Sequence, residues 1–327
     1  MRAPGFWAAR KPTALARLLQ PAGAIYGAIT TRRMQRVGAR VGAPVVCVGN
    51  FVAGGAGKTP AALALARMLI ADGRRVAFLS RGYGGARRAE PVKVDPATHD
   101  AAAVGDEPLM LANLAPCWVG PDRVASARAA VEAGAEVLVL DDGLQNPALA
   151  KTLAFAVVDG ELGFGNGLIV PAGPLRAPLA AQAPLAHALI VVGGDAAARR
   201  AIGVALPRLT VFAATLEPDA MAAAPLIGRE VVAFAGIARP EKFYATLRRI
   251  GAQVVATRDF PDHHVFSERQ IAALIEEATR RRALLVTTEK DRVRLPARAA
   301  RSVMTLPVTL RFDEPRAVLE TLRRALR

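Results

Sequence analysis

A lysine and a threonine that follow a glycine-rich turn are the residues of this chain best suited to hold a phosphate chain. The stretch PVVCVGNFVAGGAGKTP (44–60) joins a β-branched apolar run to an alanine- and leucine-rich segment. Strand, glycine turn, Lys58-Thr59 and helix in this order predict a P-loop, in which backbone N–H groups and the helix N-terminus surround phosphate oxygens. Lys58 would reach the β- and γ-phosphates, and Thr59 would ligate Mg²⁺. The alternative is an ordinary glycine-rich turn between a strand and a helix.

The residues expected to bind the nucleotide form one run. They are Gly54, Gly55, Ala56, Gly57, Lys58, Thr59 and Pro60. The strict pattern G-x-x-x-x-G-K-[ST] requires glycine at position 52, where this chain has Val52. The intact GG-x-GKT core is typical of the deviant P-loops of partitioning ATPases and metallochaperone GTPases. The pattern therefore favours a nucleoside triphosphate and leaves the reaction open.

Two pairs of neighbouring carboxylates could act beside this loop. The segment AEVLVLDDGLQN (135–146) reads as a strand that ends at Asp141-Asp142. This is the Walker-B pattern, in which the strand end holds a carboxylate next to Mg²⁺, although an aspartate that caps the next turn would look the same. Asp106-Glu107 open a predicted helix, where they would be an N-cap and a first-turn acid, or a base or metal partner.

The loop FPDHHVF (260–266) contains two of the four histidines. Asp262 followed by His263 and His264 could suggest a metal site, but the sequence has no further Cys/His cluster at zinc spacing. A histidine that assists proton transfer or orients a carboxylate is the chemical interpretation that we favour. A loop that caps the next helix is the structural alternative.

The elements that must position these side chains alternate between strands and helices. Apolar runs and intervening helical segments up to residue 194 predict a parallel sheet, and a second βαβαβ series follows a proline- and glycine-rich stretch near 205–228. The predicted fold is α/β, with two α/β/α domains of which the larger, N-terminal one is P-loop NTPase-like. We expect an N-terminal segment at 1–40, a P-loop domain at 41–210 and a smaller α/β domain at 211–327.

The composition is that of a globular, strongly basic protein. The chain has 327 residues, 52% of them hydrophobic, and a formal net charge of +15. Such a charge suggests a polyanionic partner, whether nucleic acid, phospholipid headgroups or a phosphorylated substrate, although an arginine-rich genome would produce the same balance. The two cysteines, Cys47 and Cys117, are too few for a disulfide framework and indicate reduced thiols.

The N-terminal segment concentrates positive charge around an apolar stretch, LARLLQPAGAIYGAIT (15–30). It is too short and too interrupted to span a bilayer, and it lacks the cleavage signature of a signal peptide. Apolar residues flanked by cations fit a helix that lies in the membrane interface, and a helix that packs across the first domain is an equal alternative. Residues 1–43 contain no acid and eight basic residues: Arg2, Arg10, Lys11, Arg17, Arg32, Arg33, Arg36 and Arg40.

Nine blocks of the sequence, in order along nearly the whole chain, resemble the tetraacyldisaccharide 4′-kinase family of Gram-negative bacteria. They are GNFVAGGAGKTP (49–60), SRGYGG (80–85), GDEP (105–108), GPDRV (120–124), DDGLQN (141–146), GFGNGLIVPAGPLR (163–176), FAGIARPEKF (234–243), FPDHHVF (260–266) and TTEKDRVRL (287–295). The resemblance implies ATP and Mg²⁺ as cofactors and transfer of the γ-phosphate to the 4′-hydroxyl of a tetraacyldisaccharide 1-phosphate in lipid A biosynthesis. It also implies a peripheral or monotopic enzyme at the anionic lipid of the cytoplasmic face of the inner membrane.

The resemblance also implies roles for individual residues. Asp106 would be the base that takes the proton of the attacking hydroxyl, His263 would orient or tune it, and Lys58 would neutralise phosphate charge. The expected metal residues are Thr59, Asp142, Glu107 and Asp141, and the resemblance leaves open which of Asp141 and Asp142 touches the ion. The expected substrate contacts are Asn50, Arg81, Tyr83, Arg123, Gln145 and Arg176.

Two other functions compete with the kinase. A partitioning-type switch ATPase would share the P-loop, but the GDEP and PDHH blocks and the basic N-terminal segment count against it. A nucleic-acid-binding protein would use the positive charge, but the sequence has no helix-turn-helix signature, no RNP-like aromatic motif and no zinc spacing. We expect neither a nucleic acid nor an obligate protein partner.

Overall fold

The strand that precedes the P-loop lies near the middle of a nine-stranded sheet. The computed structural model describes residues 4–9, 11–86, 90–296 and 298–327. The strand order is β13-β8-β7-β6-β1-β5-β2-β4-β3, and the pairings are parallel except at the two edges, β13·β8 and β3·β4. The strands are β1 (Val45–Gly49), β2 (Val76–Ser80), β3 (Val92–Lys93), β4 (Cys117–Val119), β5 (Val137–Asp141), β6 (Leu153–Asp159), β7 (Ala188–Val192), β8 (Thr210–Pro218) and β13 (Val308–Phe312).

Helices cover both faces of this sheet. One face buries alanine and leucine side chains of α3 together with residues of α5 and α13, and the other face packs against α6, α7 and α8. Because both faces are covered, the central strands are apolar throughout, as the runs in the sequence predicted. The helices of this domain are α1 (Ala14–Leu18), α2 (Gln20–Met34), α3 (Lys58–Ala71), α4 (Ala101–Val104), α5 (Asp106–Ala112), α6 (Arg123–Glu132), α7 (Leu179–Gln182), α8 (Ala196–Ala205) and α13 (Pro315–Ala325).

A second, smaller domain has its own parallel sheet, in the order β10-β9-β11-β12. Apolar residues of α10 and α11 pack on its opposite faces. The elements are β9 (Glu230–Ala235), β10 (Gln253–Asp259), β11 (Leu284–Thr288), β12 (Met304–Leu306), α9 (Ala220–Ala223), α10 (Pro240–Arg249), α11 (Glu268–Arg280) and α12 (Glu289–Arg292). Two α/β/α domains are thus confirmed.

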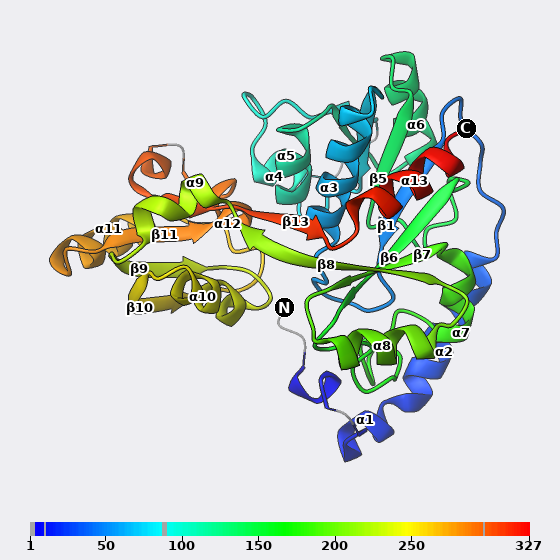
Figure 1. Cartoon of the computed structure of the whole chain (residues 1–327), viewed down its shortest axis with the longest axis horizontal. Coiled ribbons are helices and arrows are strands. Elements are labelled where there is room, and N and C mark those ends of the chain that lie inside the picture. Colours follow the sequence, from blue (N-terminus) through cyan, green and yellow to red (C-terminus); the bar gives the residue numbers. More distant parts are fainter. Residues whose placement is uncertain (1–3, 10, 87–89, 297) are drawn as a thin grey trace.

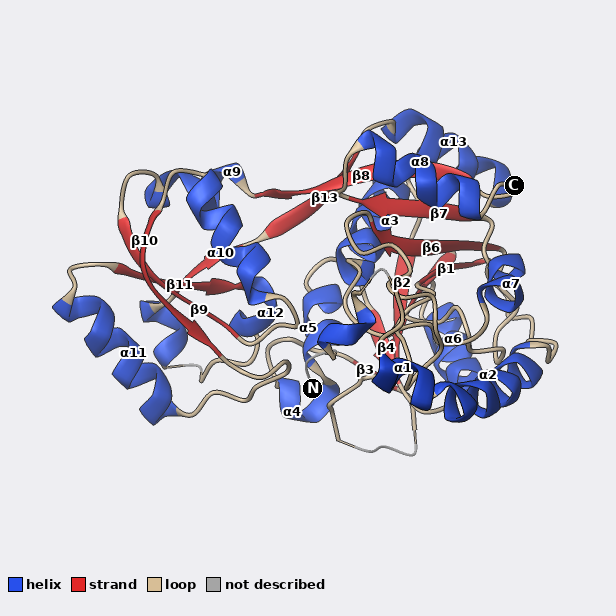
Figure 2. Ribbon diagram, turned by 90° about the horizontal axis from the view of Figure 1, so that it is seen from below, coloured by secondary structure: helices blue, strands red, loops and turns tan. Residues whose placement is uncertain are grey.

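The boundary between the domains differs from the predicted division at residue 210. The stretch near 205–228 was expected to be a linker, but β8 lies inside it and pairs with β7 of the large sheet. The chain also returns, because β13 pairs antiparallel with β8 and α13 packs against α3. Figures 1 and 2 show β8 and β13 as a ribbon that joins the two domains. The small domain therefore has two connections to the large one.

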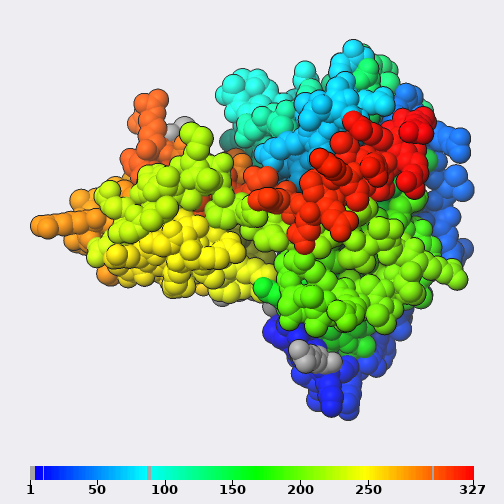
Figure 3. Space-filling model, viewed as in Figure 1, coloured from blue at the N-terminus to red at the C-terminus, as the bar shows by residue number. Residues whose placement is uncertain are grey.

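The N-terminal helices project from the large domain, at the bottom of Figure 3. One side of α2 packs closely on the loop around Ile169: a Cβ on Gly23 would come within 2.9 Å of the Ile169 carbonyl oxygen, and one on Gly27 within 2.8 Å of its Cδ1. Ile25 and Ile29 on the same helix are each 65% exposed. The helix α2 therefore has one side that packs on the large domain and one exposed apolar side. These two sides fit the two predicted roles, packing across the domain and lying in a membrane interface.

Two further findings concern the N-terminal segment. Within the described residues, no helix has the length and hydropathy needed to cross a membrane. Arg2 and Arg10, two of its eight basic residues, lie outside the described residues.

Candidate active site

The P-loop connects the carboxyl end of β1 to the N-terminus of α3. Gly54 (φ +115°) and Gly57 (φ +88°) adopt the left-handed backbone region that favours glycine, and Gly57 directly precedes the helix. The fourteen-residue helix α3 directs its N-terminal N–H groups toward the loop. The Lys58 ammonium donates to the carbonyl oxygen of Gly54 at 3.2 Å, so the lysine lies folded over the loop. This geometry is that of a phosphate-binding site.

Asp141 is the aspartate that lies next to the P-loop threonine. Because β5 pairs with β1 so that Asp141 is level with Val48, its side chain faces the start of α3. The Thr59 hydroxyl donates to Asp141 Oδ2 at 3.1 Å, and Asp141 Oδ1 is buried without a hydrogen-bond partner. Burial, reinforced by the charges of Glu107 and Asp142, raises the pKa of Asp141 to about 7. A buried carboxylate with an unused oxygen indicates a place for a cation.

Asp142 faces two cations instead. It has a positive φ (+52°), which turns it away from Asp141, and its carboxylate lies 3.1 Å from Arg176 and 4.0 Å from Lys58. Burial alone would raise the pKa of Asp142, but the charges of Lys58 and Arg176 bring it below its ordinary value. Of the two aspartates expected near the metal, Asp141 therefore contacts Thr59, whereas Asp142 contacts Lys58 and Arg176.

These residues fit a magnesium ion that arrives with a nucleotide. Among the described residues, no group of three His, Cys, Asp or Glu side chains could hold a metal alone. Mg²⁺ is usually bound by one or two carboxylates together with phosphates and waters, so such a group is unnecessary. Thr59 and Asp141 would hold the ion, and the unpartnered Asp141 oxygen is the observation that supports this fit.

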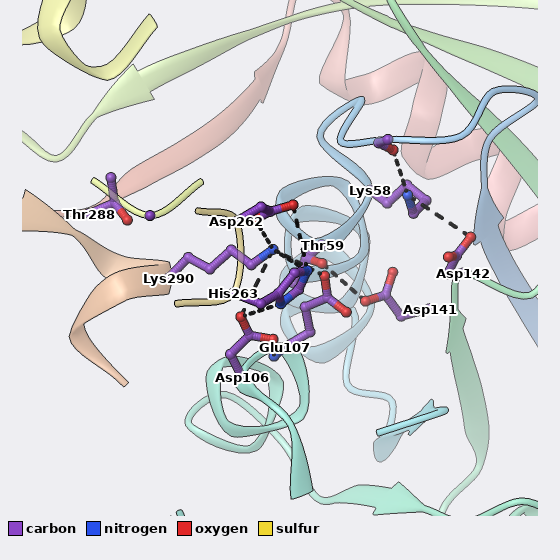
Figure 4. A network of polar contacts seen from close by, with 12 residues as sticks. Lys58, Thr59, Asp106, Glu107, Asp141, Asp142, Asp262, His263, Thr288 and Lys290 are labelled. Atoms are coloured by element: carbon purple, nitrogen blue, oxygen red, sulfur yellow. Dashed lines mark hydrogen bonds and ion pairs between the residues drawn. The ribbon is translucent and has the colours of Figure 1, made fainter. Parts of the chain in front are cut away.

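Asp106 and His263 meet at the interface between the two domains (Figure 4). Asp106 is buried at the start of α5, and His263 lies in the loop after β10, with Nδ1 3.0 Å from Asp106 Oδ2. His263 has a positive φ of +61°, a conformation that costs a non-glycine residue free energy and that often marks functional positions. The carboxyl ends of both parallel sheets thus meet, and each contributes one member of this pair.

Two cations of the small domain, Lys290 and Arg294, complete this cluster, and the sequence analysis did not assign them a role. The Lys290 ammonium lies 3.3 Å from His263 Nε2, 3.6 Å from Glu107, 3.5 Å from Asp262 and 3.9 Å from Asp106. Arg294 Nε lies 3.5 Å from Asp106 and is fixed by Asp291 at 2.9 Å. Two signals could have found them: both lie in the block TTEKDRVRL (287–295) that carries the family resemblance, and both follow β11, at the same sheet edge as His263.

These contacts set the charge of Asp106. Burial alone would raise the pKa of its carboxyl, but the hydrogen bond with His263 and the charges of Lys290 and Arg294 outweigh it and hold that pKa below its ordinary value. Asp106 is therefore an ionised hydrogen-bond acceptor at neutral pH. An anionic acceptor of this kind, near a phosphate site, can take the proton of an attacking hydroxyl.

Five of the six residues expected to contact a substrate fall into two groups. Arg81 and Tyr83 are exposed after β2, and the Tyr83 ring lies edge-on to His263 at 5.4 Å between centroids. Three others are buried and held by the protein. Arg123 donates to the carbonyls of Ser80 and Gly120, Gln145 donates to the Asn50 carbonyl and to Gln182, and Asn50 donates to the Gly54 carbonyl.

The side chain of Arg176 contacts both the P-loop and Asp142. Its Nε donates to the Val52 carbonyl at 3.1 Å, while its other end pairs with Asp142. The loop that bears it is also bound to the P-loop by the main-chain bond from Ala53 to the Pro174 carbonyl, 2.7 Å long. Arg176 therefore supports the loop and still has part of its side chain, 26%, exposed to solvent.

Comparison with known proteins agrees with this geometry. Residues 15–327 match the family described as tetraacyldisaccharide-1-P 4′-kinase. The chain is 57% identical to the tetraacyldisaccharide 4′-kinase of Methylobacterium radiotolerans, with 100% of this chain and 99% of the relative covered. It is 51% identical to that of Rhodospirillum centenum, with 100% and 96% covered.

A solved structure shares the fold. The crystal structure of LpxK from Aquifex aeolicus in complex with ATP superposes with a TM-score of 0.74 at 24% identity, covering 96% of this chain and 100% of that one. Since the family match and the identities to its members extend over nearly the full length, the chain belongs to the tetraacyldisaccharide-1-P 4′-kinase family.

Proposed function

We propose that this protein transfers the γ-phosphoryl group of ATP to the 4′-hydroxyl of a tetraacyldisaccharide 1-phosphate, a step of lipid A biosynthesis. The names of relatives at 51% to 57% identity support the substrate, and the P-loop supports the nucleotide. The observation that carries the proposal is the 3.0 Å contact between Asp106 and His263, which joins the domains beside that loop.

In the proposed reaction the 4′-oxygen forms a bond to the γ-phosphorus, and the bond from that phosphorus to the β,γ-bridging oxygen breaks. ADP leaves with the electron pair, and Asp106 accepts the hydroxyl proton. The P-loop N–H groups and Lys58 hold the phosphates and neutralise the negative charge that moves to the leaving oxygen. His263 keeps the Asp106 carboxylate oriented.

Mg²⁺ is part of this proposal. The ion would supply charge neutralisation between the phosphates. Thr59 and Asp141 would hold the ion. Glu107 lies close enough for its charge to raise the pKa of Asp141. Asp142 is paired with Lys58 instead.

We also propose that the lipid is met at the cytoplasmic face of the inner membrane, by a peripheral or monotopic contact through α1 and α2. Two features support an interfacial contact with anionic lipid. The apolar side chains of Leu18, Ile25 and Ile29 are exposed. The cations Arg32 and Arg33, at the end of α2, are exposed as well. Arg81, Tyr83 and Arg176 are the candidates for contacts with the disaccharide phosphate.

The experiment that tests the function is transfer of ³²P from γ-labelled ATP to purified disaccharide 1-phosphate in detergent micelles. We expect labelled lipid in the presence of Mg²⁺ and none with EDTA. ATP hydrolysis without labelled lipid would replace the kinase with the switch ATPase. Labelled lipid that persists in EDTA would remove Mg²⁺ from the proposal and leave the transferase.

A further inference from the structure

Lys290 occupies a position that neither the P-loop nor the Asp106–His263 pair explains. Its backbone lies in the small domain, in the short helix α12 that follows β11. Its ammonium group lies among carboxylates of both domains (Figure 4). Its nearest polar atom among the contacts described above is not a carboxylate oxygen, however, but His263 Nε2 at 3.3 Å. The ammonium therefore acts on the ring as well as on the acids.

The chemistry of the two groups determines where the ring proton lies. A lysine ammonium has three donors and no acceptor, so His263 Nε2 must accept and carries no hydrogen. The single proton of the neutral ring is then on Nδ1, which lies 3.0 Å from Asp106 Oδ2 and donates to it. Asp262 Oδ2 is 3.7 Å from Nε2, beyond hydrogen-bond distance, and does not compete with Lys290.

A doubly protonated ring is the rival arrangement, because three carboxylates lie nearby. It would place an N–H⁺ against the ammonium of Lys290 at 3.3 Å, and two like charges at that distance repel. The carboxylates nearest to the ring already have a cation, since Lys290 pairs with Asp262 and Arg294 pairs with Asp106. This repulsion leaves Nε2 as the hydrogen-bond acceptor that faces the Lys290 ammonium.

We propose that Lys290 is a positioning residue for phosphoryl transfer: by donating to His263 Nε2 it holds the ring proton on Nδ1 and leaves Asp106 as the proton acceptor. The inference rests on the proposed kinase function. With Nδ1 donating and Nε2 occupied, His263 has no free site for a proton from the substrate. Its remaining role is to orient Asp106, and Lys290 maintains that role from the second domain.

The test compares Lys290→Met, which keeps the length and removes the charge, with Lys290→Arg, which keeps a donor. Lys242→Met is the matched control, because Lys242 is another lysine of the small domain that reaches across to the large one, at 2.9 Å from Asp159 and 3.0 Å from Glu161. It does not face His263. Arg239 remains paired with Asp159 at 2.9 Å in that control, so the domains keep a contact there.

The first readout is the tautomer of His263, from long-range ¹⁵N–¹H correlation of the imidazole rings. The chain has only four histidines, and the spectrum of His263→Gln assigns the signal. We expect the Nδ1–H form in the wild type and in Lys242→Met. Lys290→Met should shift the ring toward the Nε2–H or the doubly protonated form, and Lys290→Arg should retain the Nδ1–H form at least in part.

The second readout is turnover in the micelle assay. We expect Lys290→Met to lower kcat about 10- to 100-fold and to leave KM for ATP unchanged. Losses of this size are typical when a residue that hydrogen-bonds to a functional side chain and orients it is removed. Lys290→Arg should recover part of the loss. An unchanged tautomer in Lys290→Met overturns the inference, whether turnover is normal or lost, and so does an effect confined to KM for ATP. If the wild type labels no lipid, the kinase proposal fails, while the tautomer measurement still decides the role of Lys290.

Discussion

Replacement of Asp141 by asparagine should change how the stability of the metal-free protein depends on pH. Asp141 is buried, and its pKa is about 7 in the folded protein against an ordinary 3.8. The folded state therefore binds a proton that the unfolded chain has already released at pH 5. The stability that this proton contributes is fully present below the unfolded pKa and is lost as the pH rises through about 7.

The size of the effect follows from the two pKa values. Between pH 5 and pH 8 the folded carboxyl loses its proton while the unfolded one is ionised throughout. This difference corresponds to about 2 to 3 kcal/mol of unfolding free energy. For a domain of this size the melting temperature should fall by about 5 to 10 °C over that range. Asp141→Asn cannot ionise, so this part of the pH dependence should disappear.

The assay is thermal unfolding in EDTA at pH 5 to 8, followed by fluorescence, for the wild type and Asp141→Asn. Asp142→Asn is the control, because Lys58 and Arg176 outweigh burial and hold the pKa of Asp142 below its ordinary value, so it should not titrate in this range. Mg²⁺ with ATP at pH 8 should restore the melting temperature of the wild type more than that of Asp141→Asn. Equal pH dependence in the wild type and Asp141→Asn would refute the reasoning.

Three other variants test the site. Lys58→Ala should lower kcat about 100- to 1000-fold, because the migrating phosphate charge loses its partner, and near-normal turnover in the micelle assay would exclude the P-loop assignment. Asp106→Ala should lower kcat by about 10² to 10⁴ with a smaller change in KM for ATP, and an effect on KM alone would exclude Asp106 as the proton acceptor. Arg123→Ala should lower the free energy of unfolding by about 3 kcal/mol in denaturant titration, because Arg123 donates to two buried carbonyls, with little effect on KM for the lipid. A selective rise in that KM would show that Arg123 binds substrate after all.

The elements of the fold were predictable where local sequence carries the information. The strands at β1 and β5 are short apolar runs, the P-loop is a fixed series of residue types, and the helices of the small domain have regular apolar spacing. The sequence could not show that β13 rejoins the large sheet, because a short apolar strand does not encode which sheet it joins. For the same reason it could not show that β8, which begins at the predicted boundary of residue 210, belongs to the large sheet.

The candidate site divides in the same way. The sequence predicted that Lys58, Thr59 and the aspartate pair lie together, since parallel strands bring their carboxyl ends to one edge, and in the structure Thr59 contacts Asp141 and Lys58 lies near Asp142. Residue type could not show whether Asn50, Gln145 and Arg123 face a ligand or support a loop from the protein interior, because the same polar residue types serve both purposes. Only the packing showed that these three are buried with protein partners.

What the sequence by itself determined is the order of the phosphate-binding parts: strand, glycine loop, Lys58-Thr59, and an aspartate pair at the end of a second strand. What only the tertiary structure decided is which atoms meet. The register of β5 against β1 turns Asp141 toward Thr59, and the closure of the small domain brings Lys290 against His263 and Asp106. These contacts join residues more than eighty positions apart in the first case and two domains in the second. Local sequence fixes only short-range geometry, so long-range packing alone could select these partners.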